Sequence, residues 1–205
     1  MHTWISSRRV RALAAAALVL TSAASVAQVA IPSEPLCPAA RSNDGTFPAT
    51  CLLWVKNAGF ESGTLQGWNV EGGHPSVGTV DHAEVLVLAR KGDQVSQVVA
   101  LPANTTINAA TLPYYVPALA TRVAGPLPAQ LKVSVSMLHP DKELPLFSRT
   151  YEVGHDWMEA IERFDGAVFP QPASLLVRIE RADSNEQSLL YVDKVSVTAR
   201  EQSAQ

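Results

Sequence analysis

The chain has 205 residues, of which 16 are Lys or Arg and 19 are Asp or Glu, and its formal net charge at pH 7 is −3. This charge and the lack of a basic patch exclude the nucleic-acid-binding classes, which need clustered cations to neutralise phosphates. The length is sufficient for one domain with a substantial core.

Residues 1–27 have the pattern of a secretory signal peptide. Three arginines within residues 8–11 precede an apolar run at residues 12–20, and small residues at 25–27 offer a cleavage site before Gln28. The apolar run is too short to span a bilayer, and no later stretch is long and apolar enough to do so. We therefore expect export to the periplasm or the cell exterior, with removal of residues 1–27.

Residues 28–51 are rich in Pro, Ser and Ala, which predicts an irregular arm ahead of the domain. Cys37 and Cys51, the two cysteines of the chain, both lie in this arm. Exported proteins meet an oxidising environment, so we expect a Cys37–Cys51 disulfide that ties the arm to the first strand. Two free thiols remain the alternative.

The stretch from Asn57 to Trp68 contains three glycines and two large aromatic residues, Phe60 and Trp68. So many conformationally permissive positions exclude a helix and indicate a tight, structured turn. We expect Phe60 to fold back onto the core and Trp68 to open the next strand. Glu61 lies between the two rings, where its carboxylate is suited to holding a cation or accepting backbone N–H groups.

Beyond this turn the chain consists of short apolar or alternating runs, with Pro and Gly in the gaps between them. This pattern predicts an all-β fold, an antiparallel β-sandwich, over residues 52–199, with 200–205 as a tail. The expected strands are Leu52–Lys56, Val85–Leu88, Gln94–Val99, Thr105–Thr111, Leu131–Leu138, Leu175–Glu180 and Leu189–Thr198.

Strand alternation assigns side chains to the two faces of a sheet. In the run from Leu131 to Met137 the odd-numbered residues are expected in the core, which leaves Lys132, Ser134 and Ser136 outside. In the run from Leu175 to Glu180 the expected outward side chains are Leu176, Arg178 and Glu180. The outer surface of these strands is therefore predicted to be mainly polar.

Catalytic patterns are absent from the sequence. The four histidines after residue 27 (His74, His82, His139 and His155) have no metal-binding spacing. No serine lies in a nucleophile elbow, and no glycine-rich loop leads into a helix that could hold phosphate. We therefore expect a protein without catalytic activity.

Two motifs carry a resemblance to a known family: the stretch from Asn57 to Trp68, and Tyr191-Val192-Asp193-Lys194-Val195-Ser196-Val197 near the end of the chain. Together they resemble the galactose-binding-domain-like β-jelly-roll, and more narrowly the carbohydrate-binding modules of bacterial glycanases. The resemblance implies a jelly roll. It also implies that Trp157–Phe164 is a strand opening on a tryptophan, with Trp68 and Trp157 in the core.

The resemblance further implies a structural calcium between the opening turn and the last strand. The implied ligands are the Gly59 carbonyl, the carboxylates of Glu61, Asp81 and Asp193, and the Glu84 carbonyl. Calcium takes six to eight oxygens in a tolerant geometry, which such a mixture can supply. In the alternative, Glu61 and Asp193 accept backbone hydrogen bonds and Asp81 is solvated.

The function implied by the resemblance is carbohydrate binding on one sheet face. A sugar ring stacks on an exposed aromatic ring while polar side chains bind its hydroxyls. The candidate ligand residues are Asn108, Tyr114, Tyr115, Ser134 and Arg178. Two alternatives stay open: the tyrosines can be packing residues, and the protein can be a structural or adhesion domain of the cell envelope without a glycan site.

Overall fold

The computed structural model describes residues 50–101, 111–165 and 174–203. The strands in these ranges are β1 (Thr50–Leu53), β2 (Asn69–Gly72), β3 (Ser76–Val80), β4 (Ala83–Leu88), β5 (Gln94–Ala100), β6 (Thr111–Ala124), β7 (Ala129–His139), β8 (Lys142–Val153), β9 (Met158–Ile161), β10 (Phe164–Asp165), β11 (Ser174–Arg181) and β12 (Leu189–Ser203). None of these ranges contains a helix that is long and apolar enough to cross a membrane.

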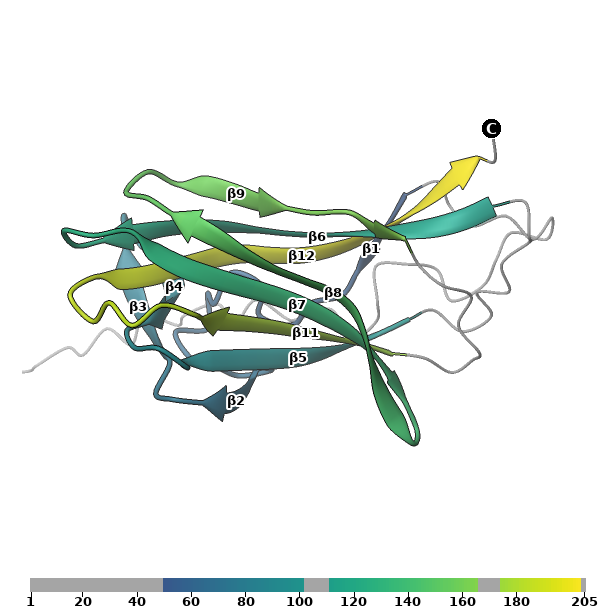
Figure 1. The fold of residues 1–205 in the computed structure, drawn as a ribbon, viewed down its shortest axis with the longest axis horizontal. Helices are drawn as coiled ribbons and strands as arrows, with labels where there is room; N and C mark the ends of the chain where they lie inside the picture. Colours follow the sequence, from purple (N-terminus) through teal and green to yellow (C-terminus); the bar gives the residue numbers. More distant parts are fainter. Residues whose placement is uncertain (1–49, 102–110, 166–173, 204–205) are drawn as a thin grey trace, which may run out of the picture. The chain divides into compact units, whose positions relative to one another are not determined.

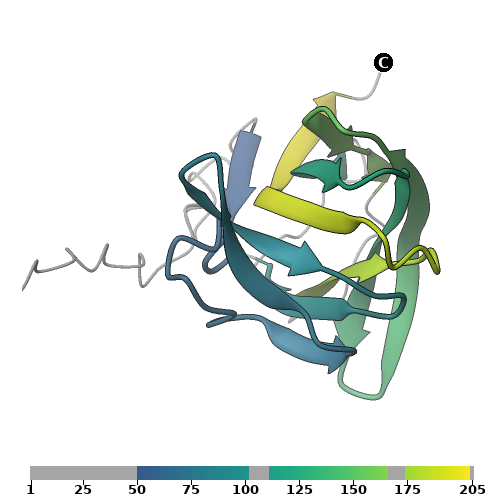
Figure 2. The same cartoon turned by 90° about the vertical axis from the view of Figure 1, so that its left-hand side faces the viewer.

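The strands form two sheets that lie face to face (Figures 1 and 2). The seven-stranded sheet has the order β10-β6-β12-β4-β3, with β1 also paired to β12 and β9 to β6. The five-stranded sheet has the order β2-β5-β11-β7-β8. The pairings between described strands are antiparallel. The predicted all-β class and the antiparallel β-sandwich of jelly-roll type are therefore confirmed.

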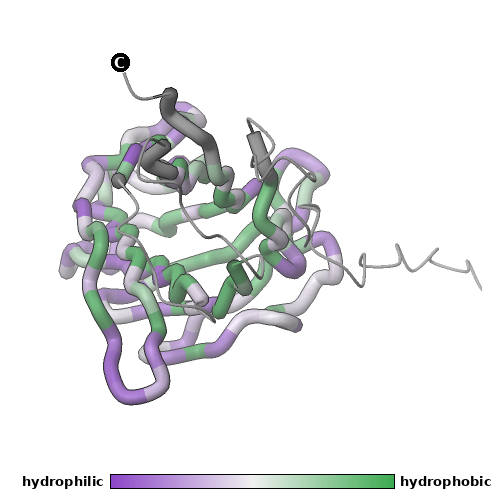
Figure 3. Tube along the Cα trace, turned by 90° about the vertical axis from the view of Figure 1, so that its right-hand side faces the viewer, coloured by the Kyte–Doolittle hydropathy of each residue, from purple (hydrophilic) through white to green (hydrophobic). Residues whose placement is uncertain are grey.

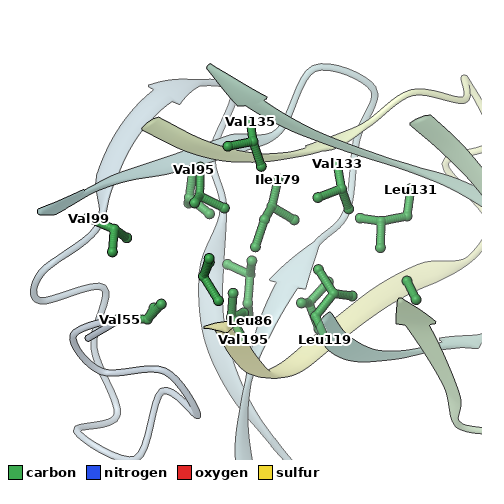
Figure 4. Close-up of a cluster of buried hydrophobic side chains, with 14 of the residues drawn as sticks. Val55, Leu86, Val95, Val99, Leu119, Leu131, Val133, Val135, Ile179 and Val195 are labelled. Carbon is green, nitrogen blue, oxygen red and sulfur yellow. The ribbon is translucent and has the colours of Figure 1, made fainter. Parts of the chain in front are cut away.

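The core lies between the two sheets and follows the predicted alternation, although Ser136 and Leu176, which were predicted to lie outside, are also buried. In β7 and β11 the inward side chains are buried: Leu131, Val133, Val135, Met137, Leu175, Val177 and Ile179. Figure 4 shows side chains of the two sheets pointing toward one another, among them Val135 of β7 and Leu119 of β6. Burial of these apolar side chains supplies the main force that holds the sheets together.

The turn at residues 57–68 packs onto this core. Phe60 is 0% exposed and stacks on Trp68 with ring centroids 5.5 Å apart. The indole N–H of Trp68 donates to the Asn57 carbonyl oxygen at 3.1 Å, and β2 begins at the next residue. The predictions that Phe60 folds onto the core and that Trp68 leads into a strand are confirmed.

The last strand, β12, changes its partner at a β-bulge. It pairs with β4 at residues 190–192 and with β1 at residues 197–200, and its register shifts between Asp193 and Ser196. Within the bulge, Val195 donates its N–H to the Ala58 carbonyl oxygen at 2.9 Å. The bulge therefore holds the opening turn against the point where β4 gives way to β1.

Pro117, which was interpreted as part of a gap between strands, lies inside β6, and Pro145 lies inside β8. Pro117 pairs with Val197 of β12. On the other edge of β6 no described strand pairs with Pro117, because β9 ends before this position and β10 begins after it. Pro145 lies beside a register shift in β8, which is an edge strand. Both sites tolerate a missing N–H, because no ladder bond is needed there.

Other element boundaries also differ from the prediction. The expected strand Trp157–Phe164 forms β9 and β10, with Trp157 outside them. β12 continues to Ser203, beyond the expected domain end at residue 199. β3 and β8 were not anticipated. The expected strand Thr105–Thr111 lies outside the described residues except for Thr111, which begins β6, and the continuation of β6 to Ala124 was not anticipated either. The signal segment, residues 28–49 of the arm and therefore Cys37 also lie outside the described residues, whereas the last two residues of the arm, Thr50 and Cys51, begin β1.

A buried arginine links the loops that follow β4 and β11. Arg181 is 0% exposed, and its Nε and Nη2 bind the Asp183 carboxylate at 3.2 and 3.1 Å. Its Nη1 donates to the carbonyl oxygens of Leu88, Ala89 and Ser188, at 3.0, 2.7 and 2.6 Å. We call this arrangement the Arg181 clasp. It supplies the hydrogen bonds that a buried charge requires.

Candidate functional site

The outer surface of the five-stranded sheet carries a row of polar residues, one from each strand. Register pairing places them side by side in the order Asn69, Ser96, Arg178, Ser134 and Ser148. The residues on either side of Arg178 in β11 are buried, so Arg178 points away from the core, as the alternation predicted. We refer to this row and the side chains bonded to it as the polar face.

Arg178 lies at the centre of the polar face between two carboxylates. Its Nε donates to Glu71 of β2 at 2.8 Å, and its Nη2 donates to Glu143 of β8 at 2.9 Å. Its Nη1 also donates to Glu143, so that pair is bidentate. Bidentate guanidinium–carboxylate pairs are strong and fix the orientation of the side chains.

Glu143 comes from the end of the β7–β8 hairpin. The register of β8 shifts between the partners of Val135 and Ser136, and such a bulge bends a strand. Figure 1 shows the hairpin bending near its turn, and Figure 3 shows that the turn is hydrophilic. The bend allows Glu143 to reach Arg178 across the polar face.

The ionisation of this group is strongly perturbed. The hydrogen bond from Arg178 and a second one from Ser136 lower the pKa of Glu143 to about 2. Burial raises the pKa of Glu71, but hydrogen bonds from Ser96, Arg178 and Gln94 outweigh burial, and the pKa lies below its ordinary value of 4.5. The hydrogen bond to Glu143 raises the pKa of Arg178. All three groups are therefore charged at neutral pH.

The structure separates the predicted ligand residues. Ser134 and Arg178 are register partners on the polar face, as expected. Tyr115 belongs to β6 in the other sheet, is 2% exposed and stacks on Phe164 with centroids 5.3 Å apart. Burial raises its pKa to about 12. The expectation that Tyr115 offers a stacking surface beside Arg178 was wrong, because alternation cannot tell which sheet a strand joins.

Two other members of the predicted ligand set are not placed. Asn108 lies outside the described residues. The backbone of Tyr114 pairs with Arg200 of β12 and Asp165 of β10, which again assigns it to the seven-stranded sheet and not to the sheet of Arg178. Among the described residues the polar face therefore presents hydrogen-bonding groups rather than aromatic rings.

The predicted metal ligands come together in part. The Glu61 carboxylate folds over Gly59, since a Cβ built on Gly59 would lie 2.1 Å from its Oε1. Burial raises the pKa of Asp193, and the nearby Glu61 carboxylate raises it further, against a lowering hydrogen bond from the Lys194 N–H. Glu61 and Asp193 therefore lie close enough to repel each other.

The other two predicted metal ligands have partners of their own. Asp81 forms an ion pair with Arg122 at 2.7 Å, and the Glu84 Oε1 accepts from the Thr79 hydroxyl at 2.9 Å. The described part of the chain contains no group of three or more His, Cys, Asp or Glu side chains that could hold a metal ion. The expected ligand atom of Glu84 was its backbone carbonyl oxygen. The hydrogen bond from Thr79 involves the Glu84 side chain and not that carbonyl.

Sequence reasoning missed an aromatic cluster on the seven-stranded sheet. Trp157, expected in the core, is 40% exposed. The Arg122 guanidinium lies over its ring at 5.3 Å and over the Tyr191 ring at 5.9 Å from the centroids. The polar residues His155 and Asp156 directly before Trp157 were the available signal that this ring borders solvent.

Comparison with protein-family models finds no match, and comparison with curated proteins finds no relative. Several solved structures are similar. The CBM22-1 xylan-binding domain of Xyn10C from Paenibacillus barcinonensis is 21% identical with a TM-score of 0.49, over 78% of this chain and 100% of that one. TmCBM61 in complex with β-1,4-galactotriose is 18% identical with a TM-score of 0.48, over 71% and 97% of the two chains.

The matching structures also include enzymes. The Stig cyclase Fisc from Fischerella sp. TAU is 14% identical with a TM-score of 0.50, and the match covers 76% of this chain and 100% of that one. At these identities the likeness concerns the fold alone. The chain is thus a jelly-roll β-sandwich similar to carbohydrate-binding modules, as the sequence motifs implied, and the same fold occurs in cyclases.

Proposed function

We propose that this protein is an exported, non-catalytic module that binds carbohydrate through the polar face. The single observation that carries the proposal is the position of Arg178, fixed between Glu71 and Glu143 at the centre of a polar row that crosses five strands. Similar folds that bind xylan and β-1,4-galactotriose support the choice of ligand class. Export rests on the signal pattern of residues 1–27.

The polar face is suited to an uncharged ligand with many hydroxyl groups. A guanidinium has five N–H groups, and three of them are used by Glu71 and Glu143, so two remain for a ligand. Each carboxylate oxygen also has further acceptor capacity. Both carboxylates already form ion pairs with Arg178, so a neutral polyol gains directional hydrogen bonds without bringing a charge of its own to the surface.

The pKa shifts on the polar face favour binding over catalysis. A general acid needs a carboxyl group that holds its proton near the operating pH. The pKa of Glu143 is about 2, and that of Glu71 lies below 4.5. Neither group has a proton to donate at neutral pH, whereas both can accept hydrogen bonds from hydroxyls.

The first test is replacement of Arg178 by lysine, which keeps the charge but removes the planar fork. A hydrogen bond to a charged group contributes about 1.5–3 kcal/mol. We therefore expect the dissociation constant for the glycan to rise about tenfold or more. The measurement is affinity electrophoresis in gels that contain xylan, β-glucan or galactan, with melting curves to show that the variant is folded.

The matched control is Arg149→Lys. Arg149 also pairs with a glutamate, Glu162, but its side chain is 57% exposed and it lies outside the polar row. This variant should migrate like the wild type. Equal retention of wild type and Arg178→Lys would reject the polar face as the site. Unretarded wild type in every gel would instead favour a structural or adhesion domain of the cell envelope.

We further propose a structural calcium held by Glu61 and Asp193, with the Gly59 carbonyl as a third oxygen. The support is the convergence of two carboxylates at the bulge of β12, where burial and Glu61 raise the pKa of Asp193. A divalent cation would neutralise this repulsion and join the opening turn to the last strand. Asp81 is left out of this set, since it is paired with Arg122.

The calcium proposal predicts that chelator lowers the melting temperature and that calcium restores it, because a ligand of the folded state stabilises by mass action. Asp193→Asn should remove the response to calcium. Without metal the raised pKa of Asp193 means that stability falls as pH rises from 3.8 through the folded-state pKa, and the Asn variant should lose this dependence.

Asp141→Asn is the control, since Asp141 is an exposed aspartate in the turn between β7 and β8. It should respond to chelator and calcium as the wild type does. A wild-type melting curve that is indifferent to both additions would reject the metal site.

A further inference from the structure

A second surface of the molecule, on the seven-stranded sheet, carries an exposed aromatic ring. Trp157 immediately precedes β9 and is 40% exposed. Of the other described tryptophans, Trp68 is buried and Trp54 is half-buried. An indole ring in water forgoes the free energy of burial, so its exposure here needs a reason.

The exposed ring is held in place by Arg122. The guanidinium carbon lies 5.3 Å from the centroid of Trp157 and 5.9 Å from that of Tyr191. Its Nη1 donates to Asp81 at 2.7 Å, while its Nε is buried without a hydrogen-bond partner in the described part of the chain. The two rings and Asp81 therefore determine the position of Arg122, rather than a full set of hydrogen bonds.

The outer surface of β6 beside this cluster carries mainly small side chains. Arg122 and Tyr191 are register partners on β6 and β12, which lie side by side with β9 (Figure 1). The inward neighbours of Arg122, Thr121 and Val123, are buried, so Arg122 points outward. The other outward positions nearby on β6 are alanines: Ala118, Ala120 and Ala124. No large side chain of β6 other than Arg122 stands beside the Trp157 ring.

We propose that Trp157, Arg122, Tyr191 and Asp81 form a second binding site, for one sugar ring of a glycan, on the opposite sheet from the polar face. Because Arg122 covers one face of the indole, the exposed area lies on the rest of the ring, where the C–H face of a pyranose can pack. The Asp81 carboxylate, whose side chain is 65% exposed, accepts hydrogen bonds from the hydroxyls. The cluster is fixed before the ligand arrives, which reduces the entropy lost on binding.

This site takes its ligand class from the proposed function but shares none of its residues. The paired charge of Arg122 and Asp81 again favours a neutral ligand. A protein partner would use the same ring in a different way, by burying it with the exposed side chains of Ile161 and Leu189. The experiment below distinguishes the two.

The test is a titration of the ¹⁵N-labelled protein with xylohexaose, cellohexaose and β-1,4-galactotriose, followed through the indole N–H signals. We expect the signal of Trp157 to shift with at least one of the three, and that of buried Trp68 to stay in place. Trp157→Ala should raise the dissociation constant at this site about tenfold or more and keep the wild-type melting temperature. Trp54→Ala is the matched control, since Lys56 lies 5.3 Å from the centroid of that ring, and it should bind as the wild type does.

Three results overturn the proposal. The first is no Trp157 shift with any of the glycans, and the second is an unchanged dissociation constant in Trp157→Ala. The third is self-association of the wild type, seen by sedimentation velocity and lost in Trp157→Ala, which would make this surface an interface between copies. In Arg178→Lys the Trp157 shift should persist. Equal retention of the wild type and Arg178→Lys in the gels, together with a Trp157 shift, would reject the polar face as a binding site and leave this site standing.

Discussion

Replacement of Arg181 by methionine is expected to lower the free energy of unfolding by about 3–5 kcal/mol, the range observed when one partner of a buried ion pair is removed. Methionine fills much of the volume but has no donors. It would leave the Asp183 carboxylate without its cation and the carbonyl oxygens of Leu88, Ala89 and Ser188 without their donor. The measurement is urea denaturation at neutral pH.

The pH dependence of this loss of stability shows whether the ion pair between Arg181 and Asp183 is its cause. Burial raises the pKa of Asp183, but the hydrogen bond from Arg181 and those from the Gln130 and Asn185 N–H groups outweigh burial, and the pKa lies below 3.8. A lowered folded-state pKa contributes stability that is present above the unfolded value and is lost as pH falls through the folded value. The difference between wild type and Arg181→Met should therefore shrink at the acidic end of the range.

Arg149→Met is the control for the removal of an arginine. Its ion pair with Glu162 is exposed, and such pairs contribute about 0–1 kcal/mol. A loss of stability in Arg181→Met no larger than that in Arg149→Met would contradict a stabilising role for the Arg181 clasp.

Replacement of Phe60 by alanine is expected to lower the free energy of unfolding by about 3–5 kcal/mol as well. Phe60 is fully buried, and its ring stacks on Trp68, so the change opens a cavity beneath the opening turn. The free energy of unfolding is measured by denaturation followed through tryptophan fluorescence, because Trp68 is in contact with Phe60.

The backbone of Phe60 offers an internal control. Its φ angle is 60°, in the left-handed region, where a side chain costs about 1–2 kcal/mol and glycine has no such cost. Phe60→Gly should therefore be more stable than Phe60→Ala, although glycine destabilises most other positions. The reverse order would show that the turn does not hold this conformation.

The features that could be predicted from the sequence depend on local alternation and on the opening turn. Period-two alternation in β7 and β11 correctly separated Val133 and Ile179 from Ser134 and Arg178. The prediction that Phe60 is buried succeeded because Phe60 is a large apolar side chain in a turn of mainly small and polar residues. Both features depend on residues that are close together in the sequence, so a short segment is enough to predict them.

The errors concern relations between distant segments. Alternation indicated that one of two adjacent tyrosines faces inward, but it could not assign β6 to the sheet opposite Arg178. Pro117 was interpreted as a gap between strands. A proline is tolerated at this position of β6 because the pairing with β9 ends beside it, and β9 lies about forty residues later in the chain. Trp157 was placed in the core by family resemblance, whereas Arg122 and Asp81, from two other parts of the sequence, hold it at the surface.

The central position of β12 has a consequence for the order in which this chain can fold. β12 pairs with β6 on one edge and with both β4 and β1 on the other, so the first described strand lies beside the last. A nascent chain that ends before residue 189 lacks the partner of all three strands, and only the five-stranded sheet has its complete set. Pairing between such distant segments gives a high contact order, for which folding is slow. We therefore expect the seven-stranded sheet to form late in folding, after the synthesis of its last strand.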